Sequence, residues 1–337
     1  MSLAITLALI CGLALCPAVA IGSDYKPMTI KISHGAPTGD PRHIGALKMK
    51  EVIEKESGGK IKVDIYPSQQ LGSGRETLEA GQGGAIEINI APSPFLGGFQ
   101  PLITVMDVPY FLPDDSAAAR KIIQGPAGQA LLKSLEKANF VGLGFWDSAY
   151  KHFTCNRAAT KPSDFEGLKF RVMPSKILMT MIKSLGASAI TFPYTEVYTA
   201  LQTGAIDGIE GSLTSIYNMK FYEAQKYVIK TYHIKSEFLI LASKVWFDKL
   251  SPKAQKLMYR ATREASDVEA PYKAEQEKKA AGLIEKGGTK ILSLTPAQLQ
   301  KFKDTMQPPC LEVFLKTNGE KGKAIVELFK KEMAKLK

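Results

Sequence analysis

Short apolar segments that alternate with helical patterns constrain the fold of this 337-residue chain more than any other feature. The apolar segments are rich in β-branched residues and bounded by Gly, Pro or Ser, which predicts strands at residues 29–33, 61–66, 86–90, 141–146, 169–172, 189–193 and 238–243. Apolar residues on one helical face predict helices at residues 43–56, 75–80, 116–123, 128–137, 176–185 and 196–203. This alternation predicts an α/β fold with mainly parallel strands. The length is sufficient for two domains.

The last third of the chain changes to long helical stretches. Ser251 followed by Pro252 is typical of a helix N-terminus, and it opens a stretch rich in Ala, Glu and Lys that ends near residue 286. Thr295 and Pro296 repeat this pattern, and residues 321–336 are amphipathic. No biased linker marks a domain boundary, so the best candidates are turns at residues 147–151 and 235–238.

The first twenty residues predict a signal peptide. They contain no charged residue, are rich in Leu, Ala and Ile, and end in the small-x-small pattern Ala18-Val19-Ala20. No other segment is long and apolar enough to span a membrane, so we expect an exported, soluble protein. Cys155 and Cys310 remain after residue 20. We expect two unpaired thiols, although export leaves a single disulfide open.

The basic balance of the chain, with a formal net charge of +11, is compatible with several anionic partners. Nucleic acid, an anionic membrane and an acidic substrate are the three general classes. The lysines are spread along helical stretches and form no dense block or nucleic-acid motif. We therefore expect no nucleic-acid binding.

The chain lacks the sequence patterns of common enzymes. Its four histidines have no metal-ligand spacing, and there is no nucleophile elbow, phosphate loop or dinucleotide fingerprint. The glycines around Ser73 are typical of a turn that starts a helix. We therefore expect no catalytic residues, no metal and no cofactor.

Arg171 is the residue that most suggests a binding site. It lies in the predicted strand at residues 169–172 and faces opposite to its apolar neighbours. A cation in such a setting needs an anion, and the planar fork of arginine matches a carboxylate. An internal ion pair, for example with Glu166 or Asp207, an arginine that is simply exposed and a bound ligand all remain open from these residues alone.

A series of ordered motifs extends along nearly the whole chain after residue 20. One segment has Gly-Leu-Lys-Phe-Arg-Val at 167–172, Leu-Gly-Ala at 185–187 and Thr-Glu-Val-Tyr-Thr-Ala-Leu-Gln-Thr-Gly-Ala-Ile-Asp-Gly at 195–208. Further landmarks are Ile-Ser-His at 32–34, Gln-Leu-Gly at 70–72, Asp-Val-Pro-Tyr-Phe at 107–111 and Trp-Phe-Asp-Lys-Leu at 246–250. Together they resemble the substrate-binding proteins of tripartite ATP-independent periplasmic (TRAP) transporters. Within that family, Gly-Leu-Gly-Phe-Trp-Asp at 142–147 through Lys151, and Ser-Lys-Ile-Leu at 175–178, are most similar to the C4-dicarboxylate binders.

The resemblance implies a two-domain periplasmic solute-binding protein with mixed sheets, strands that cross between the domains and a long helix that spans both. Domain I is predicted at residues 25–148 plus 237–276, and domain II at residues 149–236 plus 277–337, with the ligand cleft between them. The resemblance also implies a monomer that carries a small carboxylate to the membrane subunits of a TRAP transporter.

The same resemblance predicts the binding residues. Arg171 matches the arginine that pairs with the ligand carboxylate, and Lys151 falls where dicarboxylate binders often place a second cation. Tyr194 matches an aromatic lid beside the carboxylate. The other predicted binding residues are His34, Arg75, Pro92, Trp146, Gly211 and Phe238.

The resemblance leaves the identity of the acid open. Gly211 and Ser212 follow Glu210 where family members often have Asn-Pro, which removes an amide that can bind ligand. Gly74 and Pro92 stand where sialic-acid binders carry acidic residues, which argues against sialic acid and opens space. A C4-dicarboxylate is the first expectation, and an aromatic, keto or sugar acid is the alternative. An exported enzyme that acts on organic acids is a competing class.

Overall fold

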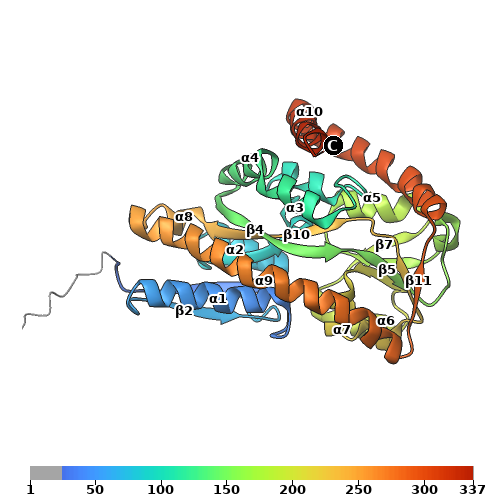
Figure 1. The fold of residues 1–337 in the computed structure, drawn as a ribbon, viewed down its shortest axis with the longest axis horizontal. Coiled ribbons are helices and arrows are strands. Elements are labelled where there is room, and N and C mark those ends of the chain that lie inside the picture. The colour runs from blue at the N-terminus through green and yellow to red at the C-terminus, as the bar shows by residue number, and fades with distance from the viewer. Residues whose placement is uncertain (1–24, 337) are drawn as a thin grey trace, which may run out of the picture.

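The computed structural model describes residues 25–336, and it contains two β-sheets with helices packed around them (Figure 1). The predicted signal peptide at residues 1–20 lies outside the described residues. The α/β fold class is confirmed, although both sheets are mixed and the sequence patterns predicted mainly parallel strands. Within residues 25–336, no helix has the length and apolar character needed to cross a membrane.

The first sheet has the strand order β2-β1-β3-β10-β4. Strands β1 (Met28–His34), β2 (Ile61–Tyr66) and β3 (Ile88–Pro92) are parallel, whereas β10 (Lys235–Ser243) runs antiparallel between β3 and β4 (Phe140–Tyr150). Helices α1 (Pro41–Glu56) and α2 (Gly74–Gln82) follow β1 and β2 in the chain.

The second sheet has the order β11-β9-β5-β8-β6-β7. All six of its strands have four residues: β5 (His152–Cys155), β6 (Lys169–Val172), β7 (Ser188–Thr191), β8 (Gly208–Gly211), β9 (Tyr227–Lys230) and β11 (Lys290–Ser293). Strand β6 is parallel to β7 and β8, while β5 is antiparallel to β8 and β9. The sequence patterns predicted β6 and β7 but missed β5, β8, β9 and β11.

Two extended segments connect the sheets. Strand β4 leads into β5 through the single residue Lys151, and residues 231–234 lead from β9 into β10. The segments lie side by side, because the Lys151 amide donates to the Ile234 carbonyl at 2.9 Å and the His233 amide donates to the Lys151 carbonyl at 3.2 Å. The predicted turns at 147–151 and 235–238 are therefore wrong. These residues lie in extended strands that are hydrogen-bonded to each other.

Helix α9 (Pro252–Lys286) spans both sheets, as predicted (Figure 1). The Ser251 hydroxyl accepts a hydrogen bond from the Ala254 amide and caps the helix. The helix packs on α1 and β4 at one end and on α7 (Leu213–Asn218) and β11 at the other. One helix thus contacts elements of both sheets.

The C-terminal helix α10 (Pro296–Ala334) is kinked at Gly319, whose φ is 54°. It packs on α5 (Lys176–Ser184), and also on η2 (Pro101–Asp107), α3 (Ser116–Gln124) and α4 (Pro126–Ser134). It therefore contacts elements on both sides of the predicted domain boundary.

The remaining helices are short. They are η1 (Ser93–Leu96), η3 (Leu135–Ala138), η4 (Pro162–Phe165), η5 (Tyr194–Glu196), α6 (Val197–Gln202), η6 (Phe221–Ala224) and α8 (Lys244–Phe247). Cys155 and Cys310 are both buried and free, which confirms the expected thiols.

Candidate functional site

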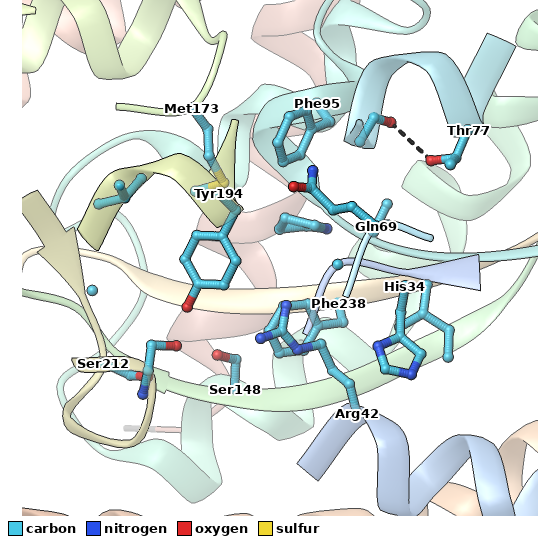
Figure 2. A pocket seen from close by; sticks show the side chains of 18 of the residues that line it. His34, Arg42, Gln69, Thr77, Phe95, Ser148, Met173, Tyr194, Ser212 and Phe238 are labelled. Atoms are coloured by element: carbon cyan, nitrogen blue, oxygen red, sulfur yellow. Dashed lines mark hydrogen bonds between the residues drawn. The ribbon is translucent and has the colours of Figure 1, made fainter. Parts of the chain in front are cut away.

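A cavity that is partly open to solvent is lined by residues from both sheets and from the crossing strands (Figure 2). The first sheet contributes residues of β1 and β3, the second sheet contributes residues of β6 and β8, and the crossing strands contribute Ser148, Lys151 and Phe238. Seven of the nine predicted binding residues line this cavity: His34, Pro92, Lys151, Arg171, Tyr194, Gly211 and Phe238.

Arg171 is buried in this cavity, with 4% of its surface exposed. Its guanidinium donates from Nε and Nη2 to the Phe192 carbonyl, at 3.2 and 3.0 Å, and lies 5.7 Å from the Tyr194 ring centroid. Burial lowers the pKa of this guanidinium, but an arginine stays protonated in proteins. Among residues 25–336, neither Glu166 nor Asp207 nor any other carboxylate forms an ion pair with it. Arg171 is thus a buried cation in need of an anion.

Lys151 is also buried in the cavity wall, but it already has a carboxylate partner. Its Nζ lies 2.8 Å from Glu210 Oε2 and 3.1 Å from Oε1, and the Glu210 side chain is fully buried. Glu210 comes from β8, which is 59 residues away in sequence. The residues alone gave no signal that this lysine is neutralised within the protein.

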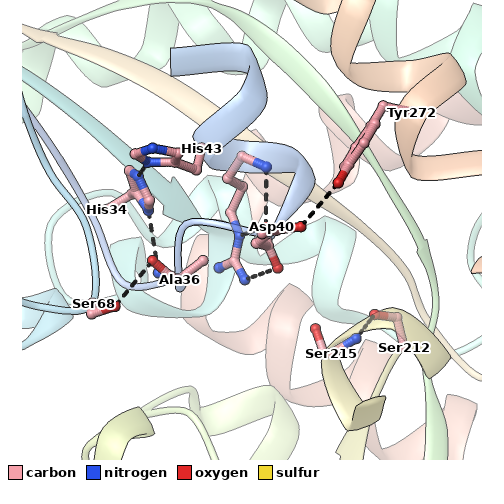
Figure 3. Close-up of polar contacts among 10 residues, drawn as sticks. His34, Ala36, Asp40, His43, Ser68, Ser212, Ser215 and Tyr272 are labelled. Carbon is pink, nitrogen blue, oxygen red and sulfur yellow. Dashed lines mark hydrogen bonds and ion pairs between the residues drawn. The ribbon is translucent and has the colours of Figure 1, made fainter. Parts of the chain in front are cut away.

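Arg42 is a third cation at the cavity, and the sequence patterns missed it. It follows Asp40, the N-cap of α1, whose carboxylate accepts from Arg42 Nε at 2.7 Å and Nη2 at 2.9 Å (Figure 3). The guanidinium also lies over the Phe238 ring, 4.4 Å from its centroid. The Asp-Pro-Arg sequence marks a helix start, but only the tertiary structure turns its arginine toward the site.

His34 forms part of the wall as a neutral residue. Its Nδ1 accepts from the Ala36 amide at 3.3 Å, and its Nε2 lies 3.1 Å from His43 Nδ1 (Figure 3). Burial, with the nearby Arg42 cation, lowers the pKa of His34 to about 3. The ring is therefore uncharged at neutral pH and contributes no cation to the cavity.

Apolar and small polar side chains make up the rest of the wall. Figure 2 shows Phe95, Met173 and Phe238 with the hydroxyls of Ser148 and Ser212 around the cavity. The space expected at Gly74 is taken by an aromatic ring: a Cβ at this glycine would lie 2.9 Å from the Phe95 ring. Burial raises the pKa of the Tyr194 phenol, which is therefore a neutral group at pH 7.

Two predicted residues lie away from this cavity. Trp146 is fully buried under α1 and α9, where its indole N–H donates to the Thr262 carbonyl at 3.0 Å. Arg75 is exposed, pairs with Glu79 at 2.8 Å, and lines a separate hollow beside Phe95. The residue types alone do not predict whether these two side chains lie in the cavity, in the core or on the surface.

A buried carboxyl group lies behind the wall. Asp107 accepts hydrogen bonds from the hydroxyls of Ser93 and Ser175. Burial raises its pKa to about 7, while Lys151 opposes this shift. In residues 25–336 there is no cluster of three or more His, Cys, Asp or Glu side chains that could hold a metal ion.

Comparisons with known proteins identify a family and similar structures for this chain. Residues 32–317 match the model of the family described as bacterial extracellular solute-binding protein, family 7. The C4-dicarboxylate-binding periplasmic protein DctP of Rhodobacter capsulatus is 34% identical over 304 residues, which cover 89% of this chain and 91% of that protein.

Two solved TRAP periplasmic solute-binding proteins are similar in structure. One, from Desulfovibrio salexigens with bound orotic acid, has a TM-score of 0.89 and 35% identity, and the match covers 92% of this chain and 99% of that chain. The other, from Shewanella oneidensis with bound succinate, has a TM-score of 0.86 and 30% identity, with 91% and 99% covered.

Proposed function

Because the chain belongs to the bacterial extracellular solute-binding protein family 7, we propose that Arg171 binds the carboxylate of a small organic acid in the cavity between the sheets. Members of this family are substrate receptors of TRAP transporters and not enzymes. The receptor then delivers the acid to the membrane subunits of its transporter. The observation that carries this proposal is the buried Arg171, which forms no ion pair with a carboxylate of the described residues; the charge of Glu210 acts on it, but Glu210 is paired with Lys151.

The physical argument rests on the cost of an unpaired buried charge. An ion taken out of water loses several kcal/mol of hydration unless an opposite charge replaces the water. The Phe192 carbonyl accepts two hydrogen bonds from Arg171 but carries no net charge. A ligand carboxylate would supply both the charge and a planar pair of acceptors, which suits a guanidinium.

The crossing strands support a mechanism of closure around the ligand. Lys151 and the segment at residues 231–234 lie where the strands pass between the sheets, and α9 contacts both sides. An acid that contacts residues of both sheets would favour the closed arrangement by its difference in affinity for the two states. We also propose that the receptor acts as a monomer and is exported by the signal peptide at residues 1–20.

Two classes of acid are candidates for the ligand. The similarity to DctP of Rhodobacter capsulatus and to the succinate-bound structure supports a C4-dicarboxylate. The similarity to the orotate-bound structure supports an acid with a larger body. Both classes place one carboxylate on Arg171, so the proposed function does not depend on the choice between them.

The test is ligand binding to wild-type and variant protein. A thermal-shift screen of dicarboxylates, keto acids, aromatic acids and sugar acids identifies a binder, and calorimetry then measures its affinity. Arg171→Gln should lower that affinity by at least 100-fold, or about 3 kcal/mol, because it removes a buried charge pair. The half-buried Arg260 pairs with Glu56 outside the cavity, so Arg260→Gln is the matched control and should keep the affinity. Wild-type affinity in Arg171→Gln would refute the assignment.

A further inference from the structure

Three cations line the cavity, and the protein itself neutralises two of them. They are Arg42, Lys151 and Arg171. We propose that Glu210 and Asp40 restrict the site to acids with one carboxylate and an uncharged body, by occupying Lys151 and Arg42 in advance. This inference rests on the proposed function and specifies its ligand.

Lys151 cannot easily exchange Glu210 for a ligand carboxylate. Both side chains are buried, with 8% and 0% of their surface exposed, and Lys151 Nζ contacts both carboxylate oxygens. A ligand carboxylate that approached Lys151 would also meet the negative charge of Glu210. Because water does not screen a buried pair, repulsion from Glu210 offsets the attraction to Lys151.

The Arg42–Asp40 pair is closed in a similar way. The Asp40 carboxylate accepts hydrogen bonds from Nε and Nη2 of the Arg42 guanidinium. The Arg42 side chain is 8% exposed and the Asp40 side chain 5%. The Phe238 ring covers one face of the guanidinium. One planar edge and one face of Arg42 are thus already used within the protein.

The sum of charges at the cavity decides how many carboxylates it can neutralise. Three cations less the charges of Glu210 and Asp40 leave one net positive charge. Arg171 is the cation without an ion pair, and the charge of Glu210 also acts on it. The nearby Asp107 adds no positive charge in either protonation state. A dianion would therefore bury one carboxylate without a counter-charge, which is strongly unfavourable.

The rest of the wall suits an uncharged body. Phe95 and Met173 offer apolar surface, and the Gln69 amide and the hydroxyls of Ser148 and Ser212 offer hydrogen bonds to neutral polar groups. This composition favours rings, amides or hydroxyls in the uncharged part of the ligand.

Matched ligand pairs test the inference directly. Each pair has the same shape, and one carboxylate is replaced by a neutral group: succinamate with succinate, 4-carbamoylbenzoate with terephthalate, and galactonate with galactarate. Calorimetry at pH 7 should show that the single carboxylate binds at least 10-fold more tightly in every pair that binds. Tighter binding of the dicarboxylate overturns the inference and leaves the proposed function intact. If no member of any pair binds, and orotate does not bind either, the proposed function itself fails.

Two variants then test the cause. Glu210→Gln frees the charge of Lys151, and Asp40→Asn frees that of Arg42 while keeping a residue that caps helices well. Each should lower the preference for the single carboxylate by at least 10-fold. Glu327→Gln removes an exposed carboxylate on α10 and should leave the preference unchanged. An unchanged preference in Asp40→Asn and in Glu210→Gln, with wild-type melting temperatures, overturns the inference; if Glu210→Gln does not fold, Asp40→Asn alone decides.

Discussion

Replacement of Glu269 by glutamine should stabilise the protein, and the gain should depend on pH. Glu269 lies on α9 beside the crossing strands and is fully buried. Neither of its carboxyl oxygens has a hydrogen-bond partner among the described residues. Burial, with the nearby carboxylates of Asp147 and Glu237, raises the pKa of Glu269 to about 9.

The sign and size of the effect follow from the two protonation states. In the unfolded chain Glu269 has a pKa of 4.5 and ionises above it, whereas in the folded protein it stays protonated until about pH 9. The unfolded state therefore binds fewer protons in this window, and stability falls as pH rises through it. A pH of 7 lies 2.5 units above the pKa of the unfolded state, so the ionisation of Glu269 lowers the free energy of unfolding at this pH by about 3 kcal/mol. At pH 5 the same reasoning gives less than about 1 kcal/mol.

Urea denaturation of wild-type protein and Glu269→Gln at pH 5 and pH 7 measures this difference. The variant should gain roughly 3 kcal/mol at pH 7 and about 1 kcal/mol or less at pH 5, because glutamine has no proton to lose. Glu285 is an exposed residue of the same helix, so Glu285→Gln is the control and should change stability by no more than about 0.5 kcal/mol at either pH. An equal effect of Glu269→Gln at both pH values would refute the reasoning.

Three other predictions concern the wall and the core. Burial raises the pKa of Asp107 to about 7, so this side chain becomes negatively charged between pH 6 and pH 8. The affinity for an acid, measured by calorimetry, should therefore fall several-fold over this range. In Asp107→Asn the affinity should not change with pH over the same range. Lys151→Met leaves Glu210 buried without its partner and should lower the free energy of unfolding by about 3–5 kcal/mol. The double variant that also carries Glu210→Gln should recover most of this loss. A Lys151→Met variant as stable as wild type would contradict the pairing. A Cβ at Gly45 would lie 2.6 Å from the Trp146 ring, so Gly45→Ala should lower the free energy of unfolding by about 1–3 kcal/mol. A Cβ at Gly282 meets nothing within 4 Å, so Gly282→Ala should raise it by roughly 0.5–1 kcal/mol. Thermal unfolding measures both, and equal shifts would argue against both.

The local sequence was sufficient for most helices and for the longer strands. The Ser251 and Thr295 caps are formed by contacts within three residues along the chain, so their helix starts are visible without a fold. Arg171 stood out for a similar reason, since an arginine between apolar neighbours in a short strand is visible in the sequence itself. The short strand β5 was missed because its four residues are held by partners far along the chain.

The charge state of the site was decided only by the tertiary structure. Lys151 became a neutralised residue because β8 brings Glu210 to it across 59 positions, and no local pattern encodes that contact. The direction of the Trp146 side chain depended in the same way on Thr262 of α9. The sequence by itself thus determined which element carries Arg171, the arginine that we propose binds the carboxylate. The fold decided how many of its neighbouring cations remain free, because the energy of a buried charge depends on what lies within a few ångströms of it in space.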